Sequence, residues 1–433
     1  MWTAQSSMSM NLRGAGWTVL AVLLISAITR AAAGVSLADA SQSTEVTSYR
    51  LEIPGSTIRT VAISPDAHFL AAGHIKSKND EHQFEFATSI SIWDLASRKW
   101  LTDKIVDSGT LPYSGSRYLT IAPEFLNYTS DGRRLVVFQG GAIRLFDPAS
   151  LVEQSHIDLD DVPLHANGSD NARVWDVKVS PVENKVAVVI GGYPARTSGL
   201  LRIYDLITSR KTFERKIEAP LGLNVANMSF SPSGNRIAIV IRKPSGPELL
   251  VMDLESATVR ALETNAWSAV FVDDNQLVTV QDWSTWMNRG KLRFYDVNSG
   301  KLVREIGGTP AGIHHRVEIS GDKKILLGYI GKHKSVWDYG MEVVNQRFRI
   351  WELPSARVVA DSEDILPLSP VDEAPNFRLS SDGKTVVALW SGDADYESMR
   401  KRRGLSRTLT QELRVFEIKR PETFAESPIP KKN

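Results

Sequence analysis

One short pattern returns seven times along this chain of 433 residues and limits the folds that the chain can adopt. Each copy is an apolar run that ends in an aromatic or large apolar residue followed by Asp or Glu. The copies are Ile92-Trp93-Asp94-Leu95, Leu145-Phe146-Asp147, Ile203-Tyr204-Asp205-Leu206, Val251-Met252-Asp253-Leu254, Phe294-Tyr295-Asp296-Val297, Ile350-Trp351-Glu352-Leu353 and Val415-Phe416-Glu417-Ile418. Successive acids are 43 residues apart at the closest, from 253 to 296, and 65 at the widest, from 352 to 417. This periodicity indicates one structural unit used seven times rather than two or three unrelated domains.

A second signal precedes each copy, an alternating apolar strand that runs into a tight turn. The turns are Ser64-Pro65-Asp66, Ser130-Asp131-Gly132, Ser180-Pro181, Ser231-Pro232-Ser233-Gly234, Asp273-Asp274-Asn275, Ser320-Gly321-Asp322 and Ser381-Asp382-Gly383. A short apolar strand follows each turn, as at 185–190, and an outer strand follows each acid, as at 301–303. Each unit therefore has four strands, which we name a to d in chain order, and a helical period dominates in none of them.

Four strands per repeat predict an all-β protein, a seven-bladed β-propeller. We expect the residue before each acid to pack between blades and the acid to cap the turn between strands c and d. The last unit ends after its c strand at Ile418, and a spare strand, 48–53, precedes the first a strand. We expect that N-terminal strand to complete the last blade and close the ring, because closure leaves the last blade no open sheet edge.

The turns and the Ile-Trp-Asp-Leu copies resemble a WD40-type propeller of the divergent, bacterial-like kind over residues 47–420. Members of that family carry a Gly-His pair between one blade and the next, whereas Gly73-His74 falls on a b strand in this sequence. The resemblance implies the fold, and it does not imply the hydrogen-bond network of Ser or Thr, His, Asp and Trp within each blade. Propellers serve as scaffolds, receptors and enzymes, so fold alone does not assign a function.

The first forty residues have the pattern of a secretory signal. Arg13 precedes the apolar run 15–28, and Arg30 and small residues follow it. The run is shorter than the roughly 20 residues that span a bilayer, and cleavage is expected after Ala33 or Ala40. An uncleaved N-terminal anchor is the alternative. We therefore expect a signal peptide at 1–40, a propeller at 47–420 and an exposed, Pro-containing tail at 421–433 of a secreted or periplasmic protein that has no membrane span after cleavage.

Composition excludes several classes of function. Lys and Arg number 51 and Asp and Glu 50; removal of residues 1–40 takes away two Arg and one Asp, which leaves (51 − 2) − (50 − 1) = 0. A neutral chain lacks the positive charge on which nucleic-acid binding draws, so we expect no nucleic-acid partner. The chain has no cysteine, which excludes disulfides, thiolate metal sites and a cysteine nucleophile. It also has no Walker, zincin or G-x-S-x-G motif, and we predict no metal, cofactor or catalytic residue.

Extra residues gather in the segments between strands b and c: 75–87, 191–198, 282–290, 331–346 and 391–411. In a propeller these segments and the d–a segments, such as 108–123 and 159–172, emerge on one face. Insertions in repeat proteins commonly gather on the binding face, so we expect this b–c loop face to bind. Four aromatic residues there are candidate anchors: Trp283, Trp286, Trp337 and Tyr339. The alternative is that these rings fold back and pack the loops.

A second set of candidates lies where the a strands begin and line the central channel. It comprises Arg173, Asp176, Asn224, Trp267, His315 and Asn376. Carboxylate, amide and imidazole groups that converge there could polarise a carbonyl. The sequence therefore predicts an extracytoplasmic binding or scaffolding propeller for a protein, peptide or envelope component. A channel-centred hydrolase or lactonase-like enzyme is the alternative.

Overall fold

The computed structural model describes most of the repeat region and none of the residues before 45 or after 419. The described ranges are 45–79, 83–112, 123–159, 161–162, 173–191, 198–218, 224–243, 246–263, 266–281, 291–306, 313–336, 340–355, 357–361, 377–391 and 411–419. Across these ranges the structure contains strands and turns, and no helix in them is long and apolar enough to cross a bilayer. The predicted signal segment and C-terminal tail lie outside the described residues.

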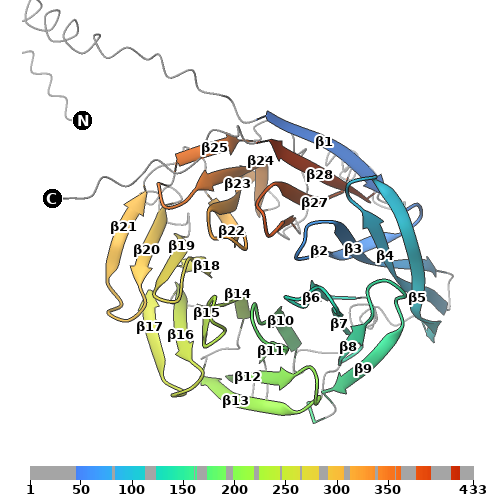
Figure 1. The fold of residues 1–433 in the computed structure, drawn as a ribbon, viewed down its shortest axis with the longest axis horizontal. Helices are drawn as coiled ribbons and strands as arrows, with labels where there is room; N and C mark the ends of the chain where they lie inside the picture. The colour runs from blue at the N-terminus through green and yellow to red at the C-terminus, as the bar shows by residue number, and fades with distance from the viewer. Residues whose placement is uncertain are drawn as a thin grey trace, which may run out of the picture. The chain divides into compact units, whose positions relative to one another are not determined.

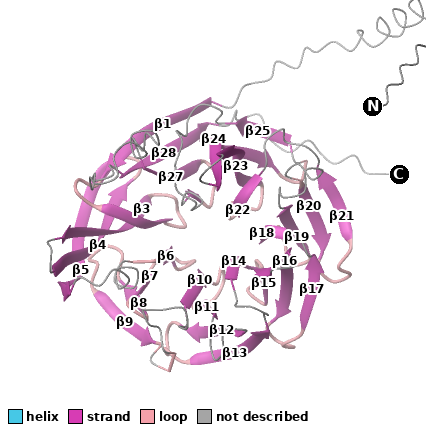
Figure 2. Ribbon diagram, turned by 180° about the vertical axis from the view of Figure 1, so that it is seen from behind, coloured by secondary structure: helices cyan, strands magenta, loops and turns pink. Residues whose placement is uncertain are grey.

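Seven four-stranded antiparallel sheets are arranged in a ring with their a strands innermost, so the predicted all-β, seven-bladed propeller is confirmed (Figures 1 and 2). Blade 1 contains β2 (Thr57–Ile63), β3 (Phe69–Asn79), β4 (Gln83–Asp94) and β5 (Lys99–Pro112). Blade 2 contains β6 (Phe125–Tyr128), β7 (Leu135–Gln139), β8 (Ala142–Phe146) and β9 (Glu153–Asp158). Blade 3 contains β10 (Arg173–Val179), β11 (Lys185–Gly191), β12 (Ser198–Asp205) and β13 (Lys211–Glu218).

Blades 4 to 7 repeat this order of strands. Blade 4 contains β14 (Asn224–Phe230), β15 (Arg236–Lys243), β16 (Gly246–Asp253) and β17 (Val259–Glu263). Blade 5 contains β18 (Ala266–Phe271), β19 (Gln276–Gln281), β20 (Leu292–Asp296) and β21 (Leu302–Ile306). Blade 6 contains β22 (Ile313–Ile319), β23 (Ile325–Val336), β24 (Gly340–Glu352) and β25 (Arg357–Asp361), and blade 7 contains β26 (Phe377–Leu379), β27 (Thr385–Ser391) and β28 (Gln411–Lys419).

The N-terminal strand β1 (Glu45–Glu52) completes blade 7, as the sequence predicts. It pairs antiparallel with β28 from Glu45 opposite Lys419 to Glu52 opposite Glu412. Leu51 is buried, and it shares one apolar cluster with Val415 of blade 7 and Trp93 of blade 1. The first and last segments of the propeller are thereby held in one sheet, which removes an open edge.

The residues before the acids pack inside the ring. All seven are buried: Trp93, Phe146, Tyr204, Met252, Tyr295, Trp351 and Phe416. Apolar clusters cross the blade boundaries, and one of them joins Phe138 and Leu145 of blade 2 to Val186 and Val188 of blade 3. Burial of apolar area between sheets is the main favourable term that holds such a ring together.

Five of the seven acids cap the c–d turn, as predicted. In each of these turns an Asp Oδ1 accepts a backbone N–H from three residues later, at 2.6 to 2.9 Å: Asp94 from Ser97, Asp147 from Ser150, Asp205 from Thr208, Asp253 from Ser256 and Asp296 from Ser299. These bonds hold the pKa of each Asp carboxyl below its usual value.

The prediction is wrong for the two glutamates. Glu352 pairs with Arg357 at 3.1 Å, and Glu417 pairs across the blade boundary with Arg98 at 3.3 Å. Blade 7 has no c–d turn for Glu417 to cap, because its outer strand comes from the other end of the chain. The extra methylene of Glu also places its carboxylate farther from the local backbone than that of Asp.

The a–b turns contain a shared side-chain bridge. Ser64 Oγ donates to Asp66 Oδ1 at 2.5 Å and accepts the backbone N–H of Phe69 at 2.8 Å. The same pairing joins Thr129 to Asp131, Ser320 to Asp322 and Ser380 to Asp382. In blades 2 and 7 the bridging hydroxyl therefore belongs to the residue before the Ser that begins the predicted turn.

Two of the predicted b–c segments are strands in most of their length. Strands β3 and β4 continue their pairing to Asn79 opposite Phe84, and β5 continues beside β4 to Pro112 opposite Gln83. In blade 6 the pairing of β23 with β24 runs to Val336 opposite Gly340. The surplus residues of blades 1 and 6 therefore extend the blades as sheet.

Candidate functional site

The extended part of blade 1 is the candidate site on the b–c loop face, because its strands are among the longest that the structure describes. We call it the blade 1 extension: residues 76–79, 83–87 and 107–112 of β3, β4 and β5. Its three strands have 11, 12 and 14 residues, whereas β7 and β8 of blade 2 have five each. In the described part of the chain β5 pairs with β4 alone, so the outer edge of β5 presents unpaired backbone groups.

Side chains at the root of this extension fix it to blade 2. Gln139 Nε2 donates to Thr88 Oγ1 at 2.8 Å, and Thr88 Oγ1 donates to the carbonyl of Asp107 at 3.2 Å. Arg144 of β8 donates to the carbonyl of Val106 at 3.3 Å. Because both sides of the root are anchored, the extension is presented by a rigid base.

A buried polar cluster lies within blade 1 just below this root. His74 Nε2 is 2.8 Å from Ser91 Oγ and 3.3 Å from Asp103 Oδ1, and Ser91 Oγ donates to Asp103 at 3.0 Å. Both contacts involve the same imidazole nitrogen, and His74 and Ser91 are fully buried. The arrangement is therefore a structural network and differs from a catalytic relay, in which the two imidazole nitrogens contact different groups.

Charged side chains gather where the a strands of blades 1, 2 and 3 begin, at the channel mouth on the same face. Burial raises the pKa of Glu124 to about 7, although the positive charges of Arg173 and Arg59 oppose the shift. The Arg173 guanidinium lies 4.8 Å from the centre of the Trp175 ring, a cation–π geometry. Of the predicted residues, Arg173 is exposed and begins β10.

Asp176 has another structural role. It is buried, its Oδ1 accepts the N–H of Val177 at 2.9 Å, and its Oδ2 accepts the N–H of Met228 in blade 4 at 3.0 Å. Equivalent bonds run from blade to blade: Asn227 to the N–H of Ala269, Ser268 to that of Val317 and Glu318 to that of Leu379. These acceptors tie neighbouring a strands around the channel, so the Asp176 carboxylate is already engaged by two backbone donors.

Three of these acceptors, Asp176, Asn227 and Ser268, each follow a bulge in their own a strand. The register shifts between Val174 and Asp176, between Val225 and Asn227, and between Ala266 and Ser268. A bulge turns the next side chain to a new direction, which explains how alternating strands send a polar group sideways to the next blade. The predicted Trp267 is the bulged residue of β18 and is partly exposed.

The other predicted residues are placed only in part. Asn224 begins β14 and His315 lies within β22, and the structure describes their backbone alone. Trp283, Trp286, Trp337, Tyr339 and Asn376 lie outside the described residues. In the described ranges no group of three or more His, Asp or Glu side chains is arranged to hold a metal ion. The convergence of His315, Asp176 and Asn224 therefore stays a prediction.

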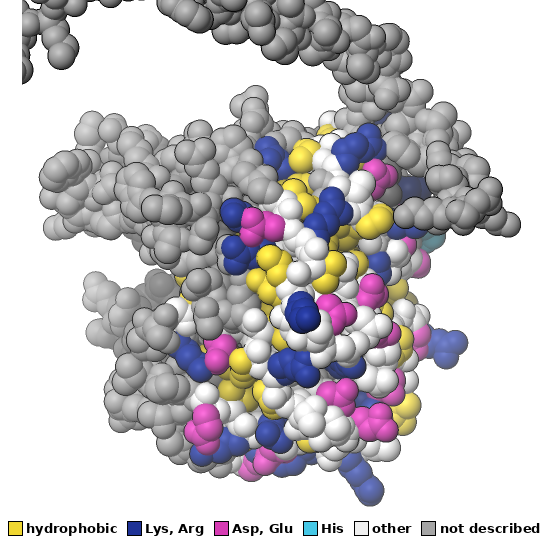
Figure 3. Space-filling model, turned by 90° about the vertical axis from the view of Figure 1, so that its left-hand side faces the viewer, with side chains coloured by type: hydrophobic (Ala, Val, Ile, Leu, Met, Phe, Trp, Pro, Cys, Tyr) yellow, Lys and Arg dark blue, Asp and Glu magenta, His cyan; other side chains and the backbone are white. Residues whose placement is uncertain are grey.

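The outer wall of the ring offers a less distinctive surface. Figure 3 shows hydrophobic side chains between positive and negative ones on one side of this wall. Exposed apolar residues of the outer strands include Leu302, Val303 and Ile105. Isolated exposed apolar residues are ordinary on protein surfaces and do not by themselves mark a site.

Comparison with known proteins shows the fold. No protein-family model matches the chain, and no curated protein matches its sequence. Among solved structures it is similar to the β-propeller domain of Myceliophteria thermophila Cps50 (Swd1), with 14% identity over 87% of this chain and 100% of that chain and a TM-score of 0.52. A chain of a mitotic checkpoint complex matches with 13% identity over 96% of this chain and 98% of that chain and a TM-score of 0.52.

A third structure, Kuenenia stuttgartiensis hydrazine synthase, matches with 16% identity over 68% of this chain and 83% of that chain, at a TM-score of 0.47. The likeness to the first two structures, at 14% and 13% identity, supports the β-propeller architecture alone.

Proposed function

We propose that this protein is an extracytoplasmic binding or scaffolding propeller that holds a protein, a peptide or a cell-envelope component on its b–c loop face. The observation that carries the proposal is the blade 1 extension, in which three strands run past the blade together from an anchored root. A scaffold that holds a long, partly unpaired strand edge away from its core favours recognition of an extended segment by strand addition.

Three further points support this proposal. The hairpin of β23 and β24 extends blade 6 on the same face. One structural neighbour belongs to a mitotic checkpoint complex, which is an assembly of proteins. The predicted anchors Trp283, Trp286, Trp337 and Tyr339 lie in the sequence at the b–c segments of this face. We also propose that the chain belongs to a divergent, bacterial-like branch of WD40 propellers.

Register gives a clean way to remove the two extensions. Ile75 pairs with Thr88, and Ile330 pairs with Arg347, so each hairpin can be closed by a two-residue Asn-Gly turn in place of 76–87 or 331–346. A matched control on the opposite face is Ile207→Ser, since Ile207 is exposed on the c–d turn of blade 3.

The test is chemical crosslinking and capture from an extracytoplasmic extract of the source organism. We expect a defined partner to be captured by the wild-type protein and the Ile207→Ser variant and lost with the shortened variants, whose melting temperatures stay near that of wild type. Capture that is equal in all four proteins would exclude the b–c loop face as the binding surface.

The proposed location has its own test. Residues 1–46 are fused to alkaline phosphatase, a reporter that is active only after export, and the N-terminus of the exported protein is sequenced. We expect an active reporter and a mature chain that begins at Gly34 or Ser41. An inactive reporter would remove the extracytoplasmic part of the proposal.

A further inference from the structure

Side chains of one blade close the junction with the next blade on the face of the a–b and c–d turns. Arg260 of β17 donates to the carbonyls of Val297 and Asn298 in the next c–d turn, the first at 3.3 Å. Arg304 of β21 donates in the same way to Pro354 and Ser355, the second at 2.6 Å. The two arginines occupy one register position on the outer strand, opposite Val251 and Phe294 of their c strands.

The junction between blades 7 and 1 uses the same position. Tyr49 of β1 pairs with Val415 and donates its hydroxyl to the carbonyl of Leu95 in the c–d turn of blade 1, at 3.2 Å. A long side chain with a donor at its tip thus occupies this position at three junctions, where it reaches a c–d turn carbonyl of the next blade.

At the junction between blades 1 and 2 this position is Thr102, which pairs with Ile92. Its side chain is too short to span the junction. The carbonyls of Pro148 and Ala149, which follow Asp147 as Val297 and Asn298 follow Asp296, accept no side-chain donor from the described residues. An arginine fills this space at the junctions of blades 4–5 and 5–6. The corresponding space between blades 1 and 2 is open.

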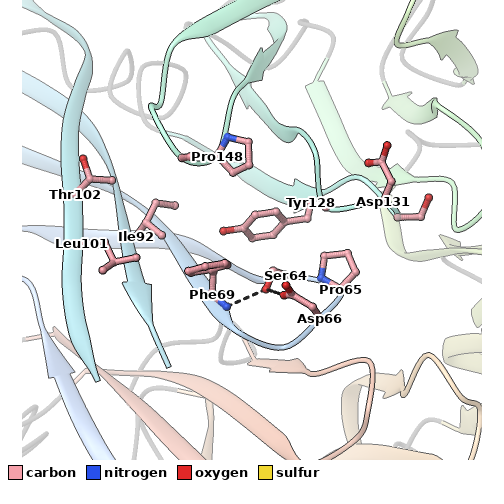
Figure 4. A pocket seen from close by; sticks show the side chains of 13 residues that line it. Ser64, Pro65, Asp66, Phe69, Ile92, Leu101, Thr102, Tyr128, Asp131 and Pro148 are labelled. Carbon is pink, nitrogen blue, oxygen red and sulfur yellow. Dashed lines mark hydrogen bonds between the residues drawn. The ribbon is translucent and has the colours of Figure 1, made fainter. Parts of the chain in front are cut away.

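A cavity of about 400 Å³ lies at this point (Figure 4). Ligand pockets commonly enclose about 300–1,000 Å³. Apolar groups of Phe69, Ile92 and Leu101 form one side, and Tyr128, Pro148 and Ala149 of blade 2 form the other. We call this space the blade 1–2 cavity.

Tyr128 supplies a polar atom without a partner. The residue is 8% exposed, and its hydroxyl is buried and makes no hydrogen bond in the described part of the chain. Burial and the nearby Asp66 charge raise the pKa of Tyr128 far above its usual value, so its hydroxyl stays neutral. An unsatisfied buried hydroxyl costs about 1–3 kcal/mol, so the apolar wall beside the Tyr128 ring is held at a cost to stability.

Two carboxylates stand at the cavity. Among the described residues that line it, Asp66 and Asp131 are the only charged ones. Burial acts to raise the pKa of Asp66, but the hydrogen bonds from Ser64 and the His68 N–H and the nearby His68 ring together outweigh it and lower that pKa. The bond from Thr129 lowers the pKa of Asp131, so both carboxylates are ionised at neutral pH. His68 lies 3.7 Å from Asp66 and is exposed. The charge of the lining therefore favours a cation.

We propose that the blade 1–2 cavity binds an arginine side chain of a partner protein or peptide. The guanidinium donates to the carbonyls of Pro148 and Ala149, as Arg260 and Arg304 donate at their junctions, while Asp66 and Asp131 balance its charge. The aliphatic stem packs on the apolar wall beside the Tyr128 ring. This site is on the face opposite the b–c loops, and the inference is independent of the function proposed above.

The inference is tested by isothermal titration calorimetry on the mature chain at low salt. The probes are the capped peptide Ala-Ala-Arg-Ala-Ala and the same peptide with citrulline, which has the shape of arginine without its charge. We expect the arginine peptide to bind at least about tenfold more tightly than the citrulline peptide. Equal affinities would overturn the assignment of a cation site.

The location is tested by filling the cavity from inside. Thr102→Arg restores the residue found at the equivalent position in blades 4 and 5, so we expect it to raise the melting temperature and to weaken arginine-peptide binding at least about tenfold. The matched control is Ser155→Arg, at the same register position of blade 2, opposite Leu145 and with the same added charge; its binding should equal that of wild type.

Further variants keep the inference falsifiable if Thr102→Arg does not fold. Thr102→Met fills the space without charge and should also block binding. Tyr128→Ala removes the ring on which the aliphatic stem packs, so we expect binding to weaken by about threefold or more, whereas Tyr128→Phe keeps the ring and should bind like wild type while stability stays equal or rises. Binding that is unchanged in the folded Thr102 variants would show that the peptide occupies another site.

Discussion

Asp176 and Met228 belong to neighbouring blades, and the Oδ2 atom of Asp176 accepts the backbone N–H of Met228 at 3.0 Å. The same relationship links Asn227 to Ala269 and Ser268 to Val317. Each acceptor follows a bulge in its a strand. Asp176 and Asn227 lie four residues before the Ser that begins the a–b turn, and Ser268 lies five residues before Asp273. The inner wall of the channel is therefore cross-linked by side chains, in addition to the apolar packing between blades.

Removal of one such link should destabilise the ring. Asp176→Ala leaves the Met228 N–H buried without its acceptor, and we expect the free energy of unfolding to fall by about 1–3 kcal/mol. Urea denaturation measures this change. Lys216→Ala, which removes an exposed side chain paired with Glu218, is the control and should change stability by about 0.5 kcal/mol or less. Equal effects of the two variants would contradict a structural role for Asp176.

Glu124 should make stability fall as pH rises. Burial raises the pKa of its carboxyl from 4.5 to about 7, so the folded chain binds this proton more tightly than the unfolded chain. The stabilising contribution is full below pH 4.5 and is lost as the pH rises through 7, by about 3 kcal/mol at most. In Glu124→Gln this loss should be absent between pH 4.5 and 7. Denaturant midpoints across that range would contradict the prediction if the two proteins changed in parallel.

His74 should make stability fall as the pH falls, which is the opposite of the effect of Glu124. Its burial outweighs the attraction of Asp103 and lowers the pKa of the imidazole, so protonation favours the unfolded chain. Its stabilising contribution is therefore present above pH 6.5, the usual value, and is lost progressively as the pH falls below it. We expect His74→Gln to reduce the acid sensitivity of the Glu124→Gln protein, in which the opposing carboxyl is absent. The Glu124→Gln protein is the control, and equal acid sensitivity with and without the His74 imidazole would contradict the prediction.

The fold could be predicted closely because the repeated pattern depends mostly on contacts between residues that are near one another in the sequence. In five copies the acid caps a turn formed by its own sequence neighbours, as Asp296 does with Ser299, and the residue before the acid is buried in all seven copies. The two errors have the same origin: Glu352 and Glu417 share the pattern, but their partners are arginines, and the partner of Glu417 lies in blade 1.

The sites were harder to predict because they depend on contacts between blades. From the sequence, Asp176 is a candidate channel residue. The structure shows that a bulge in β10 precedes it and that its carboxylate accepts the N–H of Met228 in the next blade. Thr102 alone does not indicate a binding site. The indication comes from its register position on the outer strand, which Arg260 and Arg304 occupy in their own blades. Alignment of the outer strands on the c-strand acids, rather than of the turns alone, is the signal that could have found this difference in the sequence.

Closure by β1 gives a further prediction, since one strand joins the two ends of the ring. Leu51→Ala removes a buried side chain from the cluster that joins blades 7 and 1, and we expect a loss of about 2–4 kcal/mol. Glu52→Ala, at the exposed neighbour in the same strand, is the control and should have little effect.

A chain that begins at Pro54 should be far less stable, because β28 then has an open edge and Leu51 and Ile53 are missing from the core. A synthetic peptide of residues 45–53 added to this shortened chain should pair with β28 and raise its melting temperature, whereas the same peptide with Asp in place of Leu51 should not. Equal melting temperatures with both peptides would show that the ring does not depend on β1 for closure.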